Sequence, residues 1–399
     1  MLSFRTAFAA MLLAGTGAAL AQDGPAPAPG PALAPAAGAP QPPPDIAVTK
    51  EEARRTVAEL AGLLEENYVF PDVAKRYAET LRSNAESGAY DGLTSGRALA
   101  ERLTADLRAV SPDNHLRVRV GPPPEGGGRR VVIRGGPAPA EGQAAEPQVR
   151  RALPFEPIEE ARWLAPGIAY IRFNIFPGDP DTVAAVDRFM KEHADAKAII
   201  FDNRTHHGGG LAEMDAMFPY LFGKPTSLVR MDTRLSVDRA RGAPMGDARL
   251  RLVPTRAEVV SRDHYVEPSR AEKRLFKAKV FVLTSGATAS AAEHMTLALK
   301  RTHRATIVGE PTAGAGNYGG QNPLDEGKFS VFIPVGRTYD PDTGKGWEGT
   351  GVAPDVAVPA DRALYEALLR SGVAAPDAER ISAEVKPKGS MARRTPRAG

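Results

Sequence analysis

Apolar side chains at helical spacing mark the first part of the chain that can build a core. Thr49 and Glu52 are spaced as a capping box, which is typical of a helix start. Before Pro71 ends this helix, its apolar stripe comprises Val57, Leu60, Ala61, Leu64 and Tyr68. Further stripes within residues 73–81 and 99–110 predict two more helices. Residues 48–110 are therefore predicted to form a small N-terminal helical domain.

Beyond residue 160, short apolar runs alternate with amphipathic segments. The predicted strands are residues 167–176, 197–202, 279–284, 305–309, 329–335 and 352–358. The predicted helices are residues 181–194, 211–222, 291–301 and 362–369. Strands that alternate with helices are typical of an α/β fold. Residues 161–371 are predicted to form this core domain.

Less regular segments connect these parts. Residues 22–47 are rich in Pro and Ala and predict an extended linker. Residues 111–160 contain one alternating strand, in which Leu116, Val118 and Val120 share a face and His115 lies on the other. The Gly- and Pro-rich stretch 121–157 predicts a long connection or a mobile flap.

The formal net charge of +3 is concentrated at the C-terminus. Residues 381–399 carry five basic side chains and one acidic one, so the rest of the chain is near neutral. We therefore expect no nucleic-acid partner. Residues 372–399 are predicted to be a basic, disordered tail.

The first 21 residues resemble a secretory signal peptide. Arg5 is followed by an apolar stretch and by the cleavage pattern Ala19-Leu20-Ala21. A periplasmic or secreted location is predicted, without stable membrane insertion after cleavage; an uncleaved N-terminal anchor is the alternative. The chain has no cysteine, so neither a disulfide nor a thiol nucleophile is available.

Ser290 stands where the strand 279–284 becomes a helix, among small residues. The free N–H groups and the positive end of a helix favour an anion beside such a hydroxyl, as acyl transfer requires. The alternative is structural, because Ser290 and Glu293 also have the spacing of a capping box.

A serine nucleophile needs a base, and the chain has seven histidines. His193, His294 and His303 are predicted to be solvated, and His264 lies in a charged stretch. His115, at the mouth of a strand, is the best placed, although a structural role is the more common one for such a histidine. Glu348, in a turn before the strand 352–358, is a candidate carboxylate.

Two glycine-rich loops are candidates for shaping a cleft. Gly208, Gly209 and Gly210 follow a buried strand, where their backbone N–H groups can approach a ligand closely. The loop 309–320 fails as a phosphate-binding motif, because Ala315 and Gly316 replace the required Lys and hydroxyl residue. Adjacent His206 and His207 make a weak metal site, so no metal or other cofactor is predicted.

Several colinear segments resemble the tail-processing serine peptidase family, which includes the carboxy-terminal processing proteases, the tricorn core protease and the interphotoreceptor retinoid-binding protein. The segments include Glu66-Asn-Tyr-Val-Phe-Pro71, Asp113-Asn-His-Leu-Arg-Val118, Asp202-x-Arg204, 284–293 and Glu348-Gly-Thr-Gly-Val-Ala-Pro-Asp355. The likeness is closest to the bacterial relatives of the retinoid-binding protein, without a PDZ domain.

This resemblance implies a crotonase-like core of β-β-α units behind the helical domain. Ala315 stands at the lysine position of the Ser–Lys branch, whereas Ser290, His115 and Glu348 fit the Ser-His-Glu network of the tricorn branch. The backbone N–H groups of Ala291 and of Gly208 or Gly209 would form the oxyanion hole. Asn114 stands where the tricorn protein has a further serine, which leaves a fourth member of the network open.

The resemblance thus implies an exported serine peptidase that hydrolyses peptides or unfolded proteins. The alternative is a non-catalytic protein that binds hydrophobic ligands or peptides on the same fold. An acyl-CoA enzyme, suggested by fold analogy alone, has little support because no adenosine-phosphate cluster is evident. A homo-oligomer is left open, with no coiled coil to support it.

Overall fold

The structure is a computed structural model that describes residues 44–113, 115–123, 155–241 and 249–393. The predicted signal peptide, most of the linker 22–47, Asn114 and most of the connection 121–157 lie outside these residues. In the part of the chain that is described, no helix is both long and apolar enough to span a bilayer.

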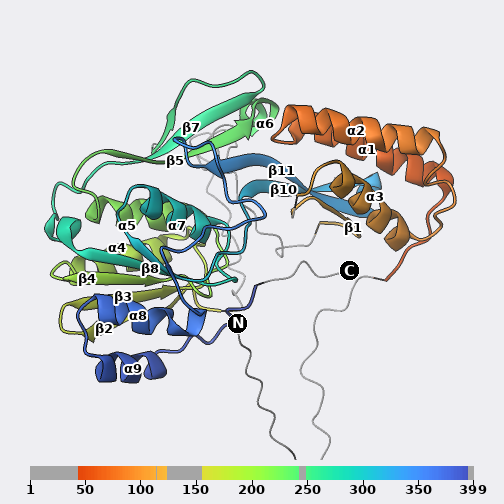
Figure 1. Cartoon of the computed structure of the whole chain (residues 1–399). Coiled ribbons are helices and arrows are strands. Elements are labelled where there is room, and N and C mark those ends of the chain that lie inside the picture. The colour runs from red at the N-terminus through yellow and green to blue at the C-terminus, as the bar shows by residue number, and fades with distance from the viewer. Residues whose placement is uncertain (1–43, 114, 124–154, 242–248, 394–399) are drawn as a thin grey trace, which may run out of the picture. The chain divides into compact units, whose positions relative to one another are not determined.

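Three helices form the predicted N-terminal domain (Figure 1). They are α1 (Lys50–Asn67), α2 (Pro71–Glu86) and α3 (Gly96–Val110). The capping box at the start of α1 is present, since the Thr49 N–H donates to the Glu52 carboxylate at 2.7 Å. The apolar stripes of the three helices are buried, and α2 packs against both α1 and α3.

The core contains a six-stranded sheet with the order β12-β9-β8-β4-β3-β2. Its strands are β2 (Ile158–Ala165), β3 (Ile168–Phe173), β4 (Ala198–Asp202), β8 (Lys279–Thr284), β9 (Thr306–Gly309) and β12 (Val356–Ala357). The strands are parallel except for β2, which pairs with β3 as an antiparallel neighbour. The segment β2–β3–α4 is a β-β-α unit, so the predicted α/β core behind a helical domain is confirmed.

Helices cover both faces of this sheet (Figure 1). Alternate strand residues such as Ile171 and Ile199 pack with α4 (Pro180–Glu192) and α7 (Ala291–Arg301). The intervening residues, such as Tyr170 and Ile200, pack with α8 (Ala363–Arg370) and α9 (Ala375–Glu384) instead. Strands buried on both sides explain the continuous apolar runs in the sequence.

A second six-stranded sheet, which the sequence analysis did not separate from the first, is antiparallel throughout. Its strands are β1 (Arg117–Val120), β5 (Thr226–Arg234), β6 (Leu250–Leu252), β7 (Val259–Val266), β10 (Asn317–Leu324) and β11 (Phe329–Tyr339). The long strand β11 pairs with β1, β5 and β10, and the Val69 N–H donates to the Pro334 carbonyl at 3.0 Å. This sheet therefore connects the helical domain to the elements around the core.

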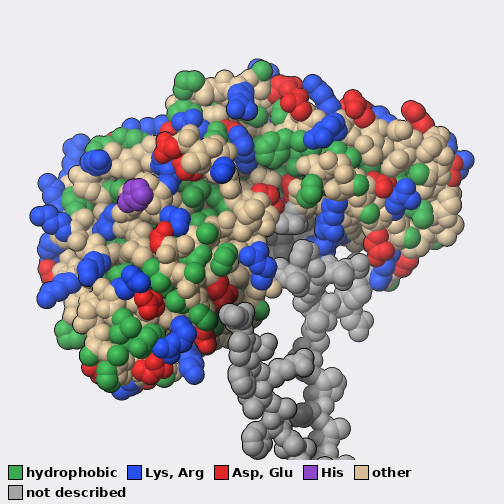
Figure 2. Space-filling view, in the orientation of Figure 1, with side chains coloured by type: hydrophobic (Ala, Val, Ile, Leu, Met, Phe, Trp, Pro, Cys, Tyr) green, Lys and Arg blue, Asp and Glu red, His purple; other side chains and the backbone are tan. Residues whose placement is uncertain are grey.

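The C-terminal segment differs from the predicted disordered tail. In α9, Ala378 and Ile381 are buried against α8, and this burial offsets the cost of ordering the chain. The backbone carbonyls of Val385 and Lys386 then accept hydrogen bonds from Arg172 at 3.0 and 3.1 Å. Charge on the visible face is mixed, with basic and acidic side chains interspersed (Figure 2).

The end of β4 contains a buried ionic cluster. The Asp202 carboxylate accepts hydrogen bonds from Tyr170 Oη at 2.6 Å, Arg172 Nε at 3.0 Å and Arg204 Nη2 at 2.7 Å. Burial by itself would raise the pKa of Asp202, but Arg204, Arg172 and Tyr170 together hold that pKa well below its ordinary value. The cluster fixes the chain at the start of the loop that contains the three consecutive glycines.

We expect Asp202→Asn to lower the free energy of unfolding by about 3–5 kcal/mol, because the buried Arg204 guanidinium loses its counter-charge and the buried Arg172 guanidinium keeps that of Glu159 but loses that of Asp202. Urea unfolding measures this loss. Since the folded pKa is lowered, the wild-type advantage is complete above about pH 4 and is lost as the pH falls through the folded value. Asp195→Asn is the control: its side chain is 78% exposed and pairs with Arg274, so a loss under about 1 kcal/mol is expected. Equal losses for the two variants would contradict this account.

Candidate active site

Ser290 lies on a strained turn between β8 and α7. Its backbone has φ +55° and ψ −116°, an uncommon conformation for a residue with a side chain. The preceding residues are tied to the end of β4, because Ser285 Oγ donates to the Arg204 carbonyl at 2.5 Å and Thr288 Oγ1 donates to the Asn203 carbonyl at 2.7 Å. A serine on a sharp strand-to-helix turn is the arrangement in which a hydroxyl is presented as a nucleophile.

The glutamate half of the capping box between Ser290 and Glu293 is also present. The buried Glu293 carboxylate accepts the Ser290 N–H at 2.7 Å, and three further donors come from the loop after β9. These donors are Thr312 Oγ1 at 2.7 Å, Gly314 N–H at 2.7 Å and Ala315 N–H at 2.8 Å. Burial raises the pKa of Glu293, and the four donors offset part of that rise. The cap thus holds the turn in place and is compatible with a chemical role for Ser290.

The C-terminal end of the same loop contacts Glu348. Glu348 Oε2 accepts the N–H groups of Gly316 at 2.6 Å and Asn317 at 2.8 Å. A Cβ at Gly316 would lie 2.8 Å from the Glu348 nitrogen, so the two backbones approach as closely as glycine permits. Residues 312–317 therefore link the Ser290 turn to Glu348.

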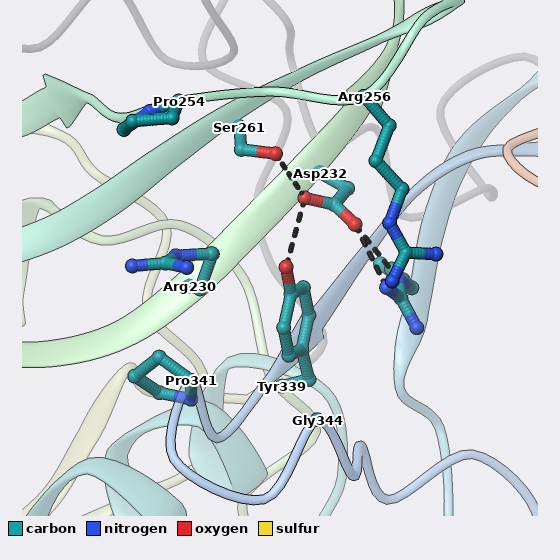
Figure 3. Close-up of a pocket in the computed structure, with 9 residues that line it drawn as sticks. Arg230, Asp232, Pro254, Arg256, Ser261, Tyr339, Pro341 and Gly344 are labelled. Carbon is teal, nitrogen blue, oxygen red and sulfur yellow. Dashed lines mark hydrogen bonds and ion pairs between the residues drawn. The ribbon is translucent and has the colours of Figure 1, made fainter.

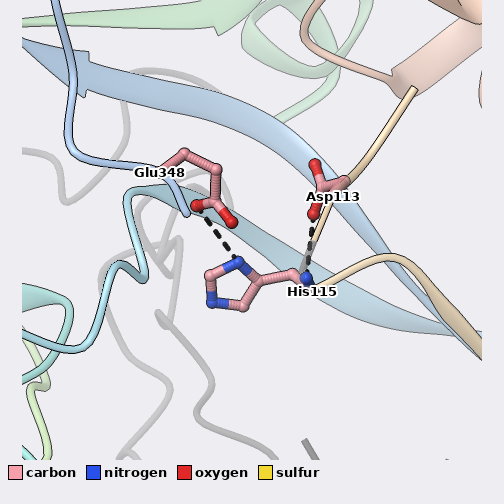
Figure 4. A group of neighbouring side chains, drawn as sticks. All are labelled: Asp113, His115 and Glu348. Carbon is pink, nitrogen blue, oxygen red and sulfur yellow. Dashed lines mark hydrogen bonds and ion pairs between the residues drawn. The ribbon is translucent and has the colours of Figure 1, made fainter. Parts of the chain in front are cut away.

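His115 and Glu348 face each other (Figure 4). His115 Nδ1 lies 3.5 Å from Glu348 Oε2, and the two side chains are 23% and 21% exposed. Burial by itself would raise the pKa of Glu348, but the His115 ring and the two backbone donors hold it below its ordinary value. An ionised carboxylate beside Nδ1 orients an imidazole and stabilises its protonated form.

Asp113 completes the cluster in Figure 4 but does not suit a metal. Ligand atoms of Asp113, His115 and Glu348 lie within 4.8 Å of one another. The two Asp113 oxygens already accept four hydrogen bonds: from His115 N–H, Leu116 N–H, Tyr68 Oη and Asn317 Nδ2. A carboxylate that is saturated in this way positions its neighbours, and little of its lone-pair capacity remains for a cation.

The glycine loop after β4 packs against Phe176. The Phe176 N–H donates to the Gly208 carbonyl at 2.7 Å, and the Gly210 N–H donates to the Phe176 carbonyl at 2.8 Å. A Cβ at Gly209, whose φ is +126°, would lie 1.9 Å from the Phe176 carbonyl oxygen. Only glycine fits there. The Gly208 N–H donates to His206 Nδ1 at 2.9 Å.

The expectation that His294 and His193 are solvated is wrong: both are buried, whereas His303 is exposed as expected. His294 Nε2 lies 2.8 Å from His264 Nδ1, and His264 Nε2 lies 2.8 Å from Asp215 Oδ1. Burial, and then the neighbouring His264, hold the pKa of His294 well below its ordinary value. The sequence feature that could have indicated this burial is that His294 stands next to the apolar Met295 in α7, where both residues are buried.

A cavity of about 330 Å³ lies on the antiparallel sheet (Figure 3). Its lining includes Arg230, Arg256 and Arg337 but none of the predicted site residues. Arg230 pairs with Asp263 at 2.6 Å, and Arg337 pairs with Asp232 at 2.9 Å. Most of the positive charge that lines the cavity is therefore compensated.

Two parts of the chain match models of known protein families. Residues 167–358 match the model of peptidase family S41. Residues 43–153 match the model of the N-terminal domain of peptidase S41 in eukaryotic IRBP. The chain belongs to peptidase family S41. This membership confirms the predicted family and the predicted serine-type peptidase, and the second match agrees with the likeness to the retinoid-binding-protein branch.

Solved structures resemble this S41 chain at low sequence identity. A photosystem II D1 C-terminal processing protease is 17% identical, with 77% of this chain and 93% of that chain covered and a TM-score of 0.48. A candidate peptidase from Parabacteroides merdae is also 17% identical. The comparison covers 85% of this chain and 98% of that chain, with a TM-score of 0.49. The tricorn protease is 13% identical, with 84% of this chain covered and a TM-score of 0.44. Only 37% of the tricorn chain is covered, so this chain spans little more than a third of tricorn's length.

We expect Glu293→Gln to lower the free energy of unfolding by about 1–3 kcal/mol, because the new amide group donates toward buried N–H groups that need an acceptor. Urea unfolding measures this loss. Glu310→Gln is the matched control, since Glu310 accepts a single backbone N–H, that of Ala360, at 3.0 Å. A Glu293→Gln protein as stable as the Glu310→Gln protein would contradict the role given to this carboxylate.

Proposed function

We propose that this S41 protein is an exported serine endopeptidase in which Ser290 is the nucleophile, His115 the general base and Glu348 the group that orients the base. The observation that carries the proposal is the continuity from the strained Ser290 turn, through Glu293 and the loop 312–317, to Glu348 beside His115. A nucleophile, a base and an orienting carboxylate that belong to one hydrogen-bonded structure are what acyl transfer requires.

In the proposed reaction, Ser290 Oγ attacks the scissile carbonyl carbon while its proton passes to His115. Because Nδ1 of His115 faces Glu348, Nε2 is the nitrogen that receives the proton. The tetrahedral intermediate collapses when the imidazolium donates this proton to the leaving amine. A water molecule then attacks the acyl-serine with the same base, which releases the second product and restores the hydroxyl group.

The oxyanion would be stabilised by backbone donors. Ala291 opens α7, and the first N–H groups of a helix have no acceptor within the helix. Of the two candidate glycines, Gly209 is favoured, because the Gly208 N–H already donates to His206. Ala315 offers no amine, and its N–H donates to Glu293, which argues against a Ser–Lys dyad here.

Peptides or unfolded proteins are the proposed substrates, and the periplasm or the extracellular space is the proposed location. Export is supported by the sequence pattern of residues 1–21. We expect N-terminal sequencing of the protein recovered from the periplasm or the medium to begin at Gln22. Recovery of a chain that retains residues 1–21 at its N-terminus would favour the uncleaved anchor.

We expect Ser290→Ala to abolish labelling by a fluorophosphonate probe and to lower kcat/KM for an unfolded protein substrate by about 10⁴-fold or more. Activity-based gel labelling and a fluorogenic casein assay measure these effects. Ser371→Ala is the control, since Ser371 caps the C-terminal end of α8 and its hydroxyl donates to the Ala367 carbonyl at 2.7 Å.

Undiminished labelling of the Ser290→Ala variant would contradict the assignment of the nucleophile. A folded wild-type protein with neither labelling nor peptidase activity would favour the non-catalytic alternative, a binder of hydrophobic ligands or peptides.

A further inference from the structure

We propose that Tyr68, Asp113 and Asn317 are positioning residues that hold His115 against Glu348, so that the helical domain sets the geometry of the base. This inference rests on the proposed function and extends it to residues that do not touch the substrate. Its basis is a buried set of hydrogen bonds that joins α1, the start of β1 and the start of β10.

Asp113 fixes the backbone that presents the imidazole. It is buried between the end of α3 and the start of β1. Its Oδ1 accepts the N–H of His115 at 2.8 Å and the N–H of Leu116 at 3.2 Å. A carboxylate that binds two successive N–H groups restricts the rotation of that segment, and therefore the direction in which the His115 side chain leaves it.

The other Asp113 oxygen is held by two donors from distant parts of the chain. Tyr68 Oη donates to Oδ2 at 3.0 Å, and Asn317 Nδ2 donates to it at 3.1 Å. Burial, and then the charge of Asp113, raise the pKa of Tyr68 far above its ordinary value, so its hydroxyl remains a donor. A buried carboxylate with all its acceptor positions occupied has little freedom to turn.

Asn317 joins both partners of the His115–Glu348 contact. Its side chain binds Asp113, which binds the His115 backbone, and its own N–H donates to Glu348 Oε2 at 2.8 Å. A shift of Asn317 would therefore move the base and its orienting carboxylate at the same time.

Tyr68 supplies the link to the helical domain. It is the C-terminal cap of α1, and the next residue, Val69, donates its N–H to the Pro334 carbonyl of β11 at 3.0 Å. The end of α1 is thus anchored to the sheet from which Asn317 comes. This gives the helical domain a function in the reaction besides its own packing.

The helical domain also contains a matched control. Tyr90 Oη and Asn84 Nδ2 donate to Asp106 Oδ2 at 2.8 and 3.0 Å, which repeats the same three residue types in another place. If Tyr–Asp–Asn clusters of this kind only stabilise the fold, disrupting the buried Asp113 cluster or the partly buried Asp106 cluster should have similar consequences for activity. If the Asp113 cluster positions the base, only its disruption should change turnover.

The test compares Tyr68→Phe and Asn317→Ala with Tyr90→Phe and Asn84→Ala in the full chain. We expect kcat to fall about 10- to 100-fold for the first pair, with KM within about twofold of wild type, because a misplaced base slows only the chemical step. The second pair should retain kcat within about twofold. Urea unfolding shows whether each variant is folded under the assay conditions.

Two further measurements separate positioning from general destabilisation. Tyr68→Phe should cause less than a twofold further loss in a His115→Ala background, because its effect acts through His115. In ¹⁵N-histidine NMR spectra, with the His115 signals assigned by their loss in His115→Gln, the ring signals should move in Tyr68→Phe and stay in place in Tyr90→Phe.

Equal kcat losses for the two pairs, losses that multiply with His115→Ala, or unmoved His115 signals would overturn the inference. The NMR comparison does not depend on turnover. An inactive wild-type protein whose His115 signals move in Tyr68→Phe would overturn the proposed function and leave the placement of His115 supported.

Discussion

The buried carboxylate of Glu293 is the constraint on which the arrangement of this site depends. It accepts donors from the Ser290 turn and from the loop 312–315, the segments that follow the paired strands β8 and β9. A buried carboxylate is tolerated only where several donors satisfy it, and here those donors come from both segments, which strengthens the contact between them. The next residues of the same loop then bind Glu348, which faces His115. Glu293 thus joins the Ser290 turn to the loop whose next residues bind Glu348.

A second buried carboxylate, also satisfied by several donors, lies at the end of β4. Asp202 at the end of β4 is compensated by Arg172 and Arg204, and Arg204 also donates to the Ala360 carbonyl near α8. The glycine loop begins directly after this cluster, so its backbone starts from a fixed point. Its packing against Phe176 admits no side chain at Gly209. Rigid supports of this kind allow backbone N–H groups to serve as preorganised donors.

The antiparallel sheet gives the helical domain a part in the same arrangement. Strand β11 pairs with β1, which follows His115, and with β10, which begins at Asn317. Hydrogen bonds from Tyr68 and Asn317 converge on Asp113, so the segments before His115 and around Glu348 share one buried polar cluster. Sequence motifs that lie more than two hundred residues apart, such as those at Asp113 and Asn317, thereby become neighbours.

The sequence by itself determined the helical domain, the parallel strands of the core and the position of Ser290 between β8 and α7, because periodicity and capping are local properties. It did not determine the second sheet, the burial of His264 and His294, the packing of α9, or the double role of Glu293. Antiparallel pairing across long separations and the burial of polar groups depend on which surfaces meet in three dimensions. A histidine or a glutamate has the same sequence signature whether it is solvated or enclosed; only the tertiary structure supplies the partners that make its burial stable.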